Sequence, residues 1–402
     1  MSESILFARN LFLPEDLGGN RYPYETIRRL GQRGHPVTVV TPRLHDAFPP
    51  LAGVRYRLYP VRRPHPSVSH FTNLLGATLA LRALGPEHDV ALAGSYDAAL
   101  ALGWAGVVPR TPLVFLFHSE FYSEWVQARG LIRHLLRRYM AAVERRVFAL
   151  SARIVAVSQF SARQIESRAP RAGHQVRVIP TGVETDFFHP PEDKHTVRAQ
   201  LGIPADIPVV LGVGRLARVK QFDRLITAFA AAWARGLDAR LIVAGDGPER
   251  RSLERLIATY GVRERVHLAG YANPERLRAF MQAADLQVCS SAFENLSLAI
   301  LEGMACGTPV LGTPGGGTPE LLGQIDPGLI LPDDHAHSIA DALPGWLADR
   351  HRLAELGHRA RRITVERYDW DRVVDGLEAV CSEVVRGSTA DSGAASEVVR
   401  RG

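Results

Sequence analysis

The chain has 402 residues, of which 46% are hydrophobic and 22% are charged, a composition typical of globular proteins rather than of disordered or fibrous ones. At roughly 100–200 residues per domain, this length suggests two domains. The cysteines Cys289, Cys306 and Cys381 are odd in number and form no close pair. This excludes a disulfide framework and a cysteine-based zinc ribbon, and it favours the reducing cytoplasm.

Positive charge is concentrated in the first half of the chain. Residues 1–185 contain 23 Arg, no Lys and 13 Asp and Glu, whereas the remainder contains 25 Lys and Arg against 29 Asp and Glu. The asymmetry indicates that the N-terminal half meets something anionic. A bias in the base composition of the gene would explain the excess of arginine equally well.

No segment of the sequence predicts a secretory signal or a membrane helix. The first residues, MSESILFARN, do not combine a basic segment with an apolar run. The longest weakly polar stretch, residues 90–108, is interrupted by Ser95, Asp97 and three glycines, whereas a membrane helix needs about 20 mostly apolar residues. We therefore expect a cytoplasmic protein.

Short apolar segments alternate with amphipathic ones along most of the chain. This rhythm predicts βαβ units with parallel sheets, and two series of about six segments each predict two doubly wound domains. We expect strands at residues 5–8, 37–41, 90–93, 113–117, 154–157 and 176–179 and, after a break, at 209–213, 239–244, 266–269, 286–289, 309–311 and 328–331.

The break between the two series covers about residues 182–202. It contains Pro190-Pro191 and a cluster of charged residues, which is typical of a linker. We therefore expect a first domain at 1–184, a second at 185–368, and a C-terminal helix at 369–386 that packs back on the first domain. The remaining residues, 387–402, are rich in Ser, Ala and Gly and are expected to be a disordered tail.

Two candidate site features follow strands of the first domain. Gly18-Gly19 precedes a helix expected from about Asn20, and adjacent glycines let a backbone approach a phosphate near a helix N-terminus. A tight turn explains these glycines about as well. His118 ends an apolar strand, so it is expected to point into a cleft, where it would bond a hydroxyl group or help in proton transfer. The alternative is a histidine that merely caps the strand.

The second domain begins with a basic loop. Gly214-Arg215-Leu216 directly follows a strand, and Lys220 comes shortly after it. The Arg215 guanidinium can bind a phosphate bidentately, and Lys220 can add a point charge to the same anion. The alternative is a solvated basic turn, since Arg218 lies between the two.

Two acidic residues accompany the start of a later helix. The segment SAFENLSLAILEGMA predicts a helix that begins at Ser297, with Glu294 in the loop before it and Glu302 in its second turn. Backbone N–H groups around Asn295, Leu296 and Ser297 would form an anion or hydroxyl site. The two carboxylates suit two hydroxyl groups of one extended ligand. The alternatives are a buried salt bridge for Glu302 and a helix-terminal charge for Glu294.

Together, these motifs resemble those of the family 4 retaining glycosyltransferases (glycosyl transferases group 1) over almost the whole chain. The most specific are G-R-L-x-x-x-K at 214–220, G-D-G-P at 245–248 and E-x7-E from Glu294 to Glu302. Weaker matches are Gly18-Gly19, His118, I-P-T-G-V at 179–183 and G-G-x-P-E ending at Glu320. The resemblance implies the α/β glycosyltransferase-B fold, in which two Rossmann-like, doubly wound domains face each other across a cleft.

The resemblance also implies a nucleotide-sugar donor, a UDP- or GDP-sugar, held mainly by the second domain. It assigns the diphosphate to Arg215 and Lys220, the ribose hydroxyls to Glu302, and the sugar hydroxyls to Glu294 and the N–H groups at 295–297. Gly18 and Gly19 would close over the phosphates, and His118 would touch the sugar. The catalytic residues would then be His118, Arg215, Lys220 and Glu294, with domain closure hinged near residues 182–186.

Such enzymes transfer with retention and need no metal, because fixed cations replace it, so we expect no cofactor. The sequence agrees in lacking Asp-x-Asp at a strand end. It departs from the usual family pattern at Gln221, where glycine is common, and at Thr181 and Glu184, where asparagine and aspartate are usual. It also lacks the glycines often seen after Glu294. Because this segment shapes the sugar subsite, the sequence does not predict which sugar is transferred.

We expect the acceptor to be a glycan, a lipid-linked molecule or a small molecule. A helix expected over 131–150 has an apolar stripe and arginines elsewhere, and residues 62–66 form a second basic stretch. Both could dock on anionic lipid at the inner face of the cell membrane, although an ordinary domain helix is the alternative. The stripe consists of Ile132, Leu135, Leu136, Tyr139, Val143 and Val147, and the arginines are Arg133, Arg137, Arg138, Arg145 and Arg146.

Other functions compete with this one. A sugar phosphorylase or a nucleotide-sugar epimerase would use the same fold, and a binding protein would hold a nucleotide sugar without turnover. The binding protein would have lost a Glu or an Arg at the motif positions, and none is lost. Nucleic-acid binding is suggested only by the charge of residues 1–185, and no aromatic interleaving or recognisable module supports it.

Overall fold

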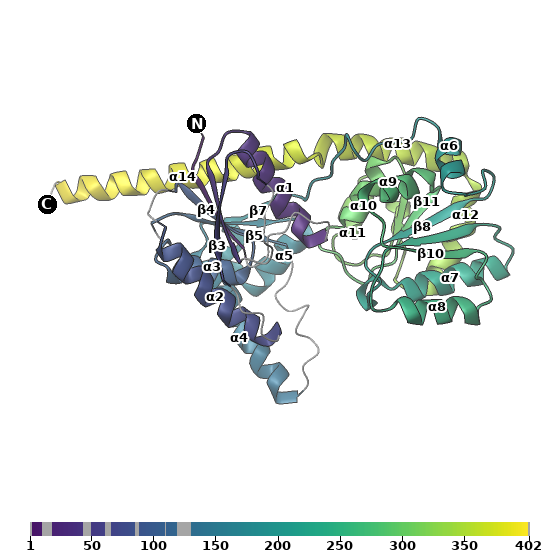
Figure 1. Cartoon of the computed structure of the whole chain (residues 1–402), viewed down its shortest axis with the longest axis horizontal. Coiled ribbons are helices and arrows are strands. Elements are labelled where there is room, and N and C mark those ends of the chain that lie inside the picture. The colour runs from purple at the N-terminus through teal and green to yellow at the C-terminus, as the bar shows by residue number, and fades with distance from the viewer. Residues whose placement is uncertain are drawn as a thin grey trace. The chain divides into compact units, whose positions relative to one another are not determined.

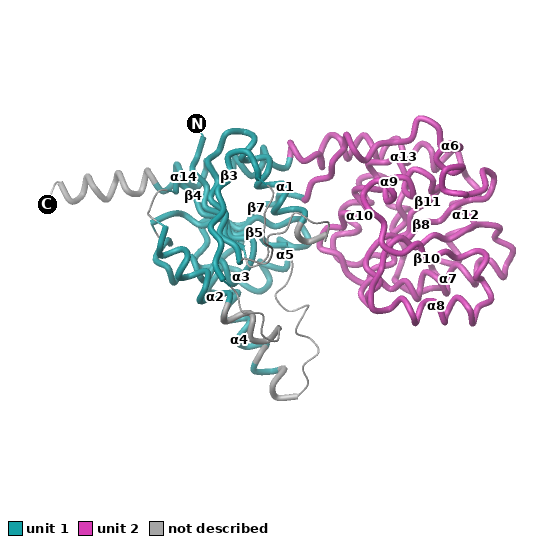
Figure 2. The backbone as a smooth tube through the Cα atoms, in the orientation of Figure 1, with its two compact units in different colours: residues 1–180, 373–402 teal, residues 181–372 magenta. Residues whose placement is uncertain are grey.

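The computed structural model describes residues 2–9, 18–42, 50–60, 66–84, 88–108, 110–118 and 130–400, with side chains described except at 18–20, 66–72, 130–133, 136 and 389–400. The chain forms two compact units (Figure 2). Unit 1 comprises Met1–Pro180 and Val373–Gly402, and unit 2 comprises Thr181–Arg372.

Unit 1 is built on a parallel sheet of seven strands in the order β3-β2-β1-β4-β5-β6-β7 (Figure 1). The central strands are continuous runs of Val, Ile, Leu, Phe and Ala that are buried along their whole length, as expected for a parallel sheet covered on both faces. The order reverses between β1 and β4, and ligands of doubly wound sheets bind beyond the carboxyl ends of strands at such a point. The strands are β1 (Ile5–Ala8), β2 (Val37–Pro42), β3 (Val54–Tyr59), β4 (Val90–Ala93), β5 (Leu113–Phe117), β6 (Arg153–Ala156) and β7 (Val176–Val178).

Helices connect these strands and cover the sheet. Helix α3 packs against both α2 and α4, and its residues from Tyr96 to Leu102 are buried. The helices of this unit are α1 (Gly18–Gln32), α2 (Pro66–Arg82), α3 (Tyr96–Trp104), α4 (Gly130–Leu150) and α5 (Gln159–Arg168), followed by the 3-10 turn η1 (Pro170–Gln175).

Unit 2 has a parallel sheet of five strands in the order β10-β9-β8-β11-β12. Its strands are β8 (Val209–Val213), β9 (Arg240–Ala244), β10 (Val266–Gly270), β11 (Leu286–Cys289) and β12 (Val310–Gly312). Its helices are α6 (Lys194–Gln200), α7 (Phe222–Ala234), α8 (Arg250–Thr259), α9 (Pro274–Ala283), α10 (Leu298–Ala305), α11 (Thr318–Leu322), α12 (Ala336–Ala348) and α13 (Arg350–Arg367), with the 3-10 turns η2 (Arg218–Lys220) and η3 (Pro327–Leu329).

Two strand predictions differ from the structure. Strand β3 was not expected, because VRYRLY alternates apolar and charged residues at the sheet edge instead of forming an apolar run. The strand expected at 328–331 is wrong. Pro327 opens the turn η3 there, and the Asp326 carboxylate accepts a hydrogen bond from the Gly328 N–H at 2.7 Å. Only Ile330 forms a single bridge, to Gly312.

The last helix, α14 (Trp370–Arg400), belongs to unit 1 from Val373 onward. Arg33 forms ion pairs at 2.7 Å with both Asp375 and Glu378 of this helix. Glu383 accepts ion pairs from Arg153 at 2.7 Å and Arg177 at 2.8 Å. Helix α14 therefore contacts the segment between α1 and β2 as well as strands β6 and β7.

The disordered tail expected at 387–402 differs from the structure, in which α14 continues as one helix to Arg400. Gly387 and Gly393 are poor helix formers, but the segment contains no proline, which would remove a backbone hydrogen bond, and its alanines are the best helix formers.

Candidate functional site

Two glycine loops pack backbone against backbone beyond β8 and β9 in unit 2. Gly214 has a φ of 147°, and a Cβ atom on Gly245 would lie 1.9 Å from the Gly214 carbonyl oxygen. The Leu216 N–H donates to the Asp246 carbonyl at 2.9 Å. This packing fixes the backbone on both sides of Arg215, whose side chain is exposed.

Lys220 ends the turn η2, and its ammonium group pairs with the Glu294 carboxylate. Ser291 donates its hydroxyl to the same carboxylate oxygen at 2.7 Å. Burial disfavours the charged ammonium, but the charge and the hydrogen bond of Glu294 outweigh it and raise the pKa of Lys220 above its ordinary value. Lys220 is therefore a cation at neutral pH, and it faces the loop that carries the first Glu of the E-x7-E motif.

The left-handed conformation of Gln221, with a φ of 49°, follows directly after Lys220. Glycine would adopt this conformation more easily. The Gln221 amide donates to the Asp334 carboxylate at 3.2 Å, and Arg224 pairs with the same carboxylate at 2.6 Å. These contacts give a physical reason for a side chain at a position where the family often has glycine.

Three successive glycines hold the backbone of the Glu294 loop. The Gly317 N–H donates to the Glu294 carbonyl at 2.7 Å. Gly316 has a φ of 69°, and a Cβ there would lie 2.0 Å from the same carbonyl oxygen. A Cβ on Gly315 would lie 2.3 Å from the Ala292 carbonyl oxygen. Only glycines permit this approach, and it determines where the Glu294 carboxylate lies.

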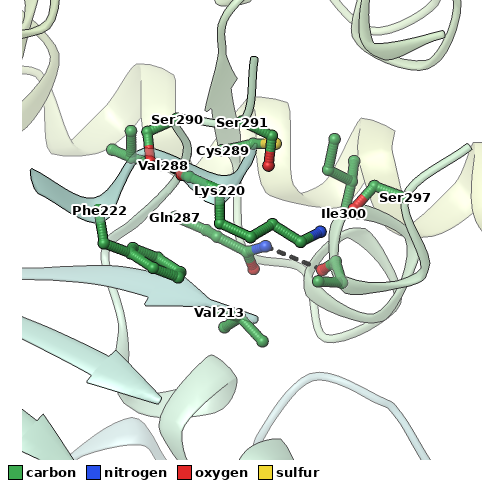
Figure 3. A pocket seen from close by; sticks show the side chains of 11 residues that line it. Val213, Lys220, Phe222, Gln287, Val288, Cys289, Ser290, Ser291, Ser297 and Ile300 are labelled. Atoms are coloured by element: carbon green, nitrogen blue, oxygen red, sulfur yellow. Dashed lines mark hydrogen bonds between the residues drawn. The ribbon is translucent and has the colours of Figure 1, made fainter. Parts of the chain in front are cut away.

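The N-terminus of α10 opens onto a small pocket. Ser297 is the N-cap residue, it is 5% exposed, and its side chain makes no capping hydrogen bond. Figure 3 shows Lys220 reaching across this pocket toward Ser297 and Ile300. The positive end of a helix and an ammonium group therefore meet in one pocket, an arrangement that favours an anion.

Glu302 lies in the second turn of α10 and is 6% exposed. Burial, followed by the charge of Glu302, raises the pKa of the Cys306 thiol one turn later. Glu302 is not among the residues that line the pocket. The structure thus brings Lys220, Glu294 and Ser297 together, and it places Glu302 on the same helix but among buried neighbours.

Of the candidate residues of unit 1, His118 lies at the carboxyl end of a strand. His118 follows β5, and its ring centroid is 4.3 Å from that of Tyr22, with the rings tilted by 59°. Burial and the nearby charge of Arg9 lower the pKa of His118 to about 3. Helix α1 begins at Gly18, but the surroundings of Gly18 and Gly19 lie outside the described residues.

Among the residues of the pocket lining that sequence reasoning missed are one amide and two hydroxyl side chains, those of Gln287, Ser290 and Ser291. Ser290 donates its hydroxyl to the Lys220 carbonyl at 2.8 Å, and the Ala292 N–H donates to the Val219 carbonyl at 2.8 Å. The end of β11 is thereby fastened to the Lys220 loop. The available signal was an amide inside an apolar strand and a pair of serines directly after it.

The described part of the chain contains neither a cluster of metal-binding side chains nor a membrane-spanning helix. No three His, Cys, Asp or Glu side chains gather there as a metal ion would require. None of the described helices is both long and apolar enough to cross a bilayer.

Comparison with known proteins shows the family. Residues 193–363 match the model of the family described as glycosyl transferases group 1, and residues 18–187 match that of glycosyltransferase family 4. The D-inositol 3-phosphate glycosyltransferase of Acidothermus cellulolyticus is 31% identical over 91% of this chain and 85% of its own length. A GDP-mannose-dependent phosphatidylinositol monomannoside mannosyltransferase of Mycobacterium tuberculosis is 29% identical over 96% of this chain and 99% of its own.

Solved structures share the fold. Sucrose-phosphate synthase from Thermosynechococcus elongatus superposes with a TM-score of 0.81, at 22% identity, over 96% of this chain and 100% of the other. Anabaena HepE in complex with UDP-glucose gives a TM-score of 0.74 at 21% identity over 95% and 100%. These findings confirm the predicted fold class and the resemblance drawn from the motifs. The chain therefore belongs to the family 4 glycosyltransferases and has the glycosyltransferase-B fold.

Proposed function

We propose that this glycosyltransferase moves a sugar from a nucleoside diphosphate sugar to an acceptor hydroxyl with retention of configuration and without a metal ion. The observation that carries the proposal is the pocket at the start of α10, which is lined by Lys220 and an uncapped helix N-terminus, with Glu294 paired to the Lys220 ammonium group. A fixed cation and N–H groups at one place suit a diphosphate whose negative charge grows as the glycosidic bond breaks.

The donor is a UDP- or GDP-sugar. A relative that is 29% identical over almost the full length of both chains is named as GDP-mannose-dependent. Two structures that share the fold hold UDP-glucose and ADP. Each of these names describes the protein that carries it. They support a nucleotide sugar here, and they leave open which base and which sugar this chain selects.

In this proposal, each candidate residue contacts a particular part of the donor. Arg215 and Lys220 bind the diphosphate, and Glu294 with the N–H groups at 295–297 binds the sugar hydroxyls. Glu302 binds the ribose, which requires its buried carboxylate to face the bound nucleotide. Gly18 and Gly19 close over the phosphates. The low pKa of His118 keeps its imidazole neutral, and its one N–H donates a hydrogen bond to the sugar.

The Lys220–Glu294 pair gives the donor two sites to bind. A phosphate can take over part of the ammonium group from Glu294, and the freed carboxylate oxygen can accept a hydrogen bond from a sugar hydroxyl. In the reaction, the bond from the sugar to the diphosphate breaks while the acceptor hydroxyl approaches on the same face. The departing phosphate takes the acceptor proton, so no protein nucleophile is needed.

The test compares three cations of one loop. R215A and K220A should each lower kcat by about two to three orders of magnitude, because they remove charge stabilisation in the transition state. R218A is the matched control, since the Arg218 side chain is 93% exposed and forms only a long ion pair, at 3.7 Å, with Glu249. The kcat of R218A should stay within about threefold of the wild-type value. Turnover is measured with UDP- and GDP-sugars by release of the nucleoside diphosphate.

Two further measurements test the mechanism. NMR of the product should show the donor's anomeric configuration, and excess EDTA should leave the rate unchanged. An inverted product would refute retention, and loss of activity in EDTA that Mg²⁺ restores would refute metal independence. Normal kinetics in both R215A and K220A would remove the basis for the proposed site.

The proposed acceptor is a glycan, a lipid-linked molecule or a small molecule, and α4 favours a lipid surface. Leu135 and Tyr139 of its predicted apolar stripe are 57% and 40% exposed, whereas Val143 and Val147 further along are buried. The arginines Arg137 and Arg138 between the exposed pair are themselves exposed. Apolar and cationic groups on one helix end suit an anionic bilayer, at the inner face of the cell membrane. Residues 62–65, Ile132 and Leu136 lie outside the described side chains.

Co-sedimentation with vesicles of phosphatidylglycerol tests this surface. The wild type should bind and should dissociate as salt is raised, and R137E/R138E should bind at least about thirtyfold less, because each of the two lost cations contributes about 1 kcal/mol at an anionic surface. The control R251E/R255E makes the same charge change on α8 of unit 2 and should bind like the wild type. Equal binding by both variants, or binding that salt does not weaken, would contradict membrane docking.

A further inference from the structure

Gln287 is a buried amide in an otherwise apolar strand. It lies in β11 and is 1% exposed. Its Nε2 donates to the Ala299 carbonyl at 2.8 Å, the bond drawn as a dashed line in Figure 3. Ala299 is in the first turn of α10, so this amide joins the strand to the very start of the helix.

The helix leaves room for this amide one turn further on. A Cβ atom on Gly303 would lie only 2.2 Å from the Gln287 Oε1. Gly303 and Ala299 are four residues apart and therefore lie on the same face of α10, the face toward β11. The Oε1 atom is buried and has no hydrogen-bond partner among the described residues. Burying an amide in this way costs stability relative to an apolar side chain, so its placement calls for a compensating role.

The strand that carries Gln287 also contacts the other two parts of the site. Ser290, just beyond β11, donates to the Lys220 carbonyl at 2.8 Å, and Ser291 donates to the Glu294 carboxylate at 2.7 Å. Gln287 lines the same pocket as Lys220 and Ser297. One short segment thus fixes the backbone of the cation, the carboxylate paired with it and the first turn of the helix.

We propose that Gln287 is a positioning residue of the donor site, which holds the N-terminus of α10 in register with the Lys220–Glu294 pair. Helix N–H groups stabilise an anion only when they point at it, and a misplacement of about 1 Å can cost a hundredfold in rate. Gly303 has no side chain, and this leaves the space that the Gln287 amide needs. This inference rests on the proposed function of the same pocket.

The first experiment replaces the amide with an apolar side chain of similar length. Q287M should weaken binding of UDP, GDP or ADP, whichever the wild type binds, by about tenfold, since the supporting contacts of a site set its geometry. The control T308V removes a buried hydroxyl that donates to the Met281 carbonyl at 2.6 Å, just beyond the other end of α10. T308V should lower the Tm similarly and change the Kd by less than about twofold. Binding is measured by titration calorimetry.

The second experiment is a double-mutant cycle between the amide and the glycine. G303A should weaken nucleotide binding about as much as Q287M, because its Cβ would displace the Gln287 amide. In Q287A, where the space is empty, adding G303A should change the Kd by no more than about twofold. A merely structural role predicts instead that Kd follows Tm in all variants.

The outcomes separate this inference from the function on which it rests. A wild type that binds none of UDP, GDP and ADP would refute the proposed function, and this inference with it. A wild type that binds one of them, while Q287M and G303A bind it equally well, would overturn the role of Gln287 alone. Additive effects of Q287A and G303A would overturn the pairing of the amide with the glycine.

Discussion

The His118 side chain combines full burial with a neighbouring positive charge. Both disfavour the imidazolium, which lowers the pKa of His118 to about 3. The unfolded chain has no such environment, so its histidine takes up a proton near pH 6.5. As pH falls through that value, the unfolded state binds a proton that the folded state does not, and the free energy of unfolding decreases.

We expect H118Q to remove this part of the acid sensitivity. Chemical denaturation between about pH 7 and about pH 5 should show a smaller loss of stability in H118Q than in the wild type. Activity should fall in H118Q, because the amide N–H groups of glutamine do not lie where the imidazole N–H lies. A wild type and a variant with the same stability slope over that range would show that His118 titrates normally.

At the scale of an element, the glycine loop at 315–317 shows how the surroundings of a glycine determine whether another residue can replace it. Gly316 and Gly261 have almost the same φ, 69° and 68°, but their surroundings differ. A Cβ on Gly316 would lie 2.0 Å from the Glu294 carbonyl oxygen, whereas a Cβ on Gly261 would have no atom within 4 Å. The two positions therefore separate the cost of the backbone conformation from the cost of the contact.

Alanine substitutions test that separation. G261A should cost about 1 kcal/mol of stability, the penalty of a left-handed non-glycine residue, and leave activity unchanged. G316A should cost more than this and lower kcat/KM by at least about tenfold, because the Glu294 loop must move. The measurements are chemical denaturation and steady-state kinetics. Equal effects of the two substitutions would show that the contact with Glu294 is unimportant.

The elements that the sequence predicted best are those whose signal is local. Central strands such as β1 and β8 are continuous apolar runs, and they were predicted residue for residue. Strand β3 alternates instead, because only part of an edge strand is buried, and η3 was mistaken for a strand because Gly-Leu-Ile-Leu is apolar. Apolar character alone does not distinguish a strand from a turn that packs on the core.

The residues of the candidate site also differ in whether the sequence alone could predict them. Lys220 and Glu294 were found because they follow strands, at the edge of a parallel sheet where ligands bind, and because they fit a known motif. Gln287 was not found, because its role depends on the first turn of α10 and on Gly303, which reach it only in the folded unit. The retaining mechanism, the metal independence and the choice of sugar remain predictions that the experiments above test.

At the scale of the molecule, α14 makes unit 1 depend on the end of the chain. Arg33, Arg153 and Arg177 of the first domain all pair with acidic residues of this helix. Hydrogen bonds from the two last-named arginines lower the pKa of Glu383, so these contacts persist at neutral pH and are lost only in acid. Buried residues of α14, among them Val374 and Leu377, add apolar contact.

Two truncations measure this dependence. A chain that ends at residue 388 retains the ion pairs of α14 with unit 1 and should keep the thermal unfolding profile of the full chain. A chain that ends at Arg372 lacks the helix, so unit 1 should lose its cooperative transition, while unit 2 retains its own sheet and core. Calorimetry and limited proteolysis follow the two units. An intact unit 1 transition without α14 would show that the helix is dispensable.

The return of α14 to unit 1 also sets an order of events during synthesis. The ribosome releases the segment that completes unit 1 last, after all of unit 2 has emerged, so the N-terminal half cannot reach its final state while translation continues. Unit 2 is contiguous in the chain and can fold first, against the usual N-to-C direction. Until α14 has been synthesised, the apolar surface of unit 1 that it covers stays accessible to chaperones. A messenger RNA truncated before the α14 codons would therefore yield a protein in which only unit 2 is folded.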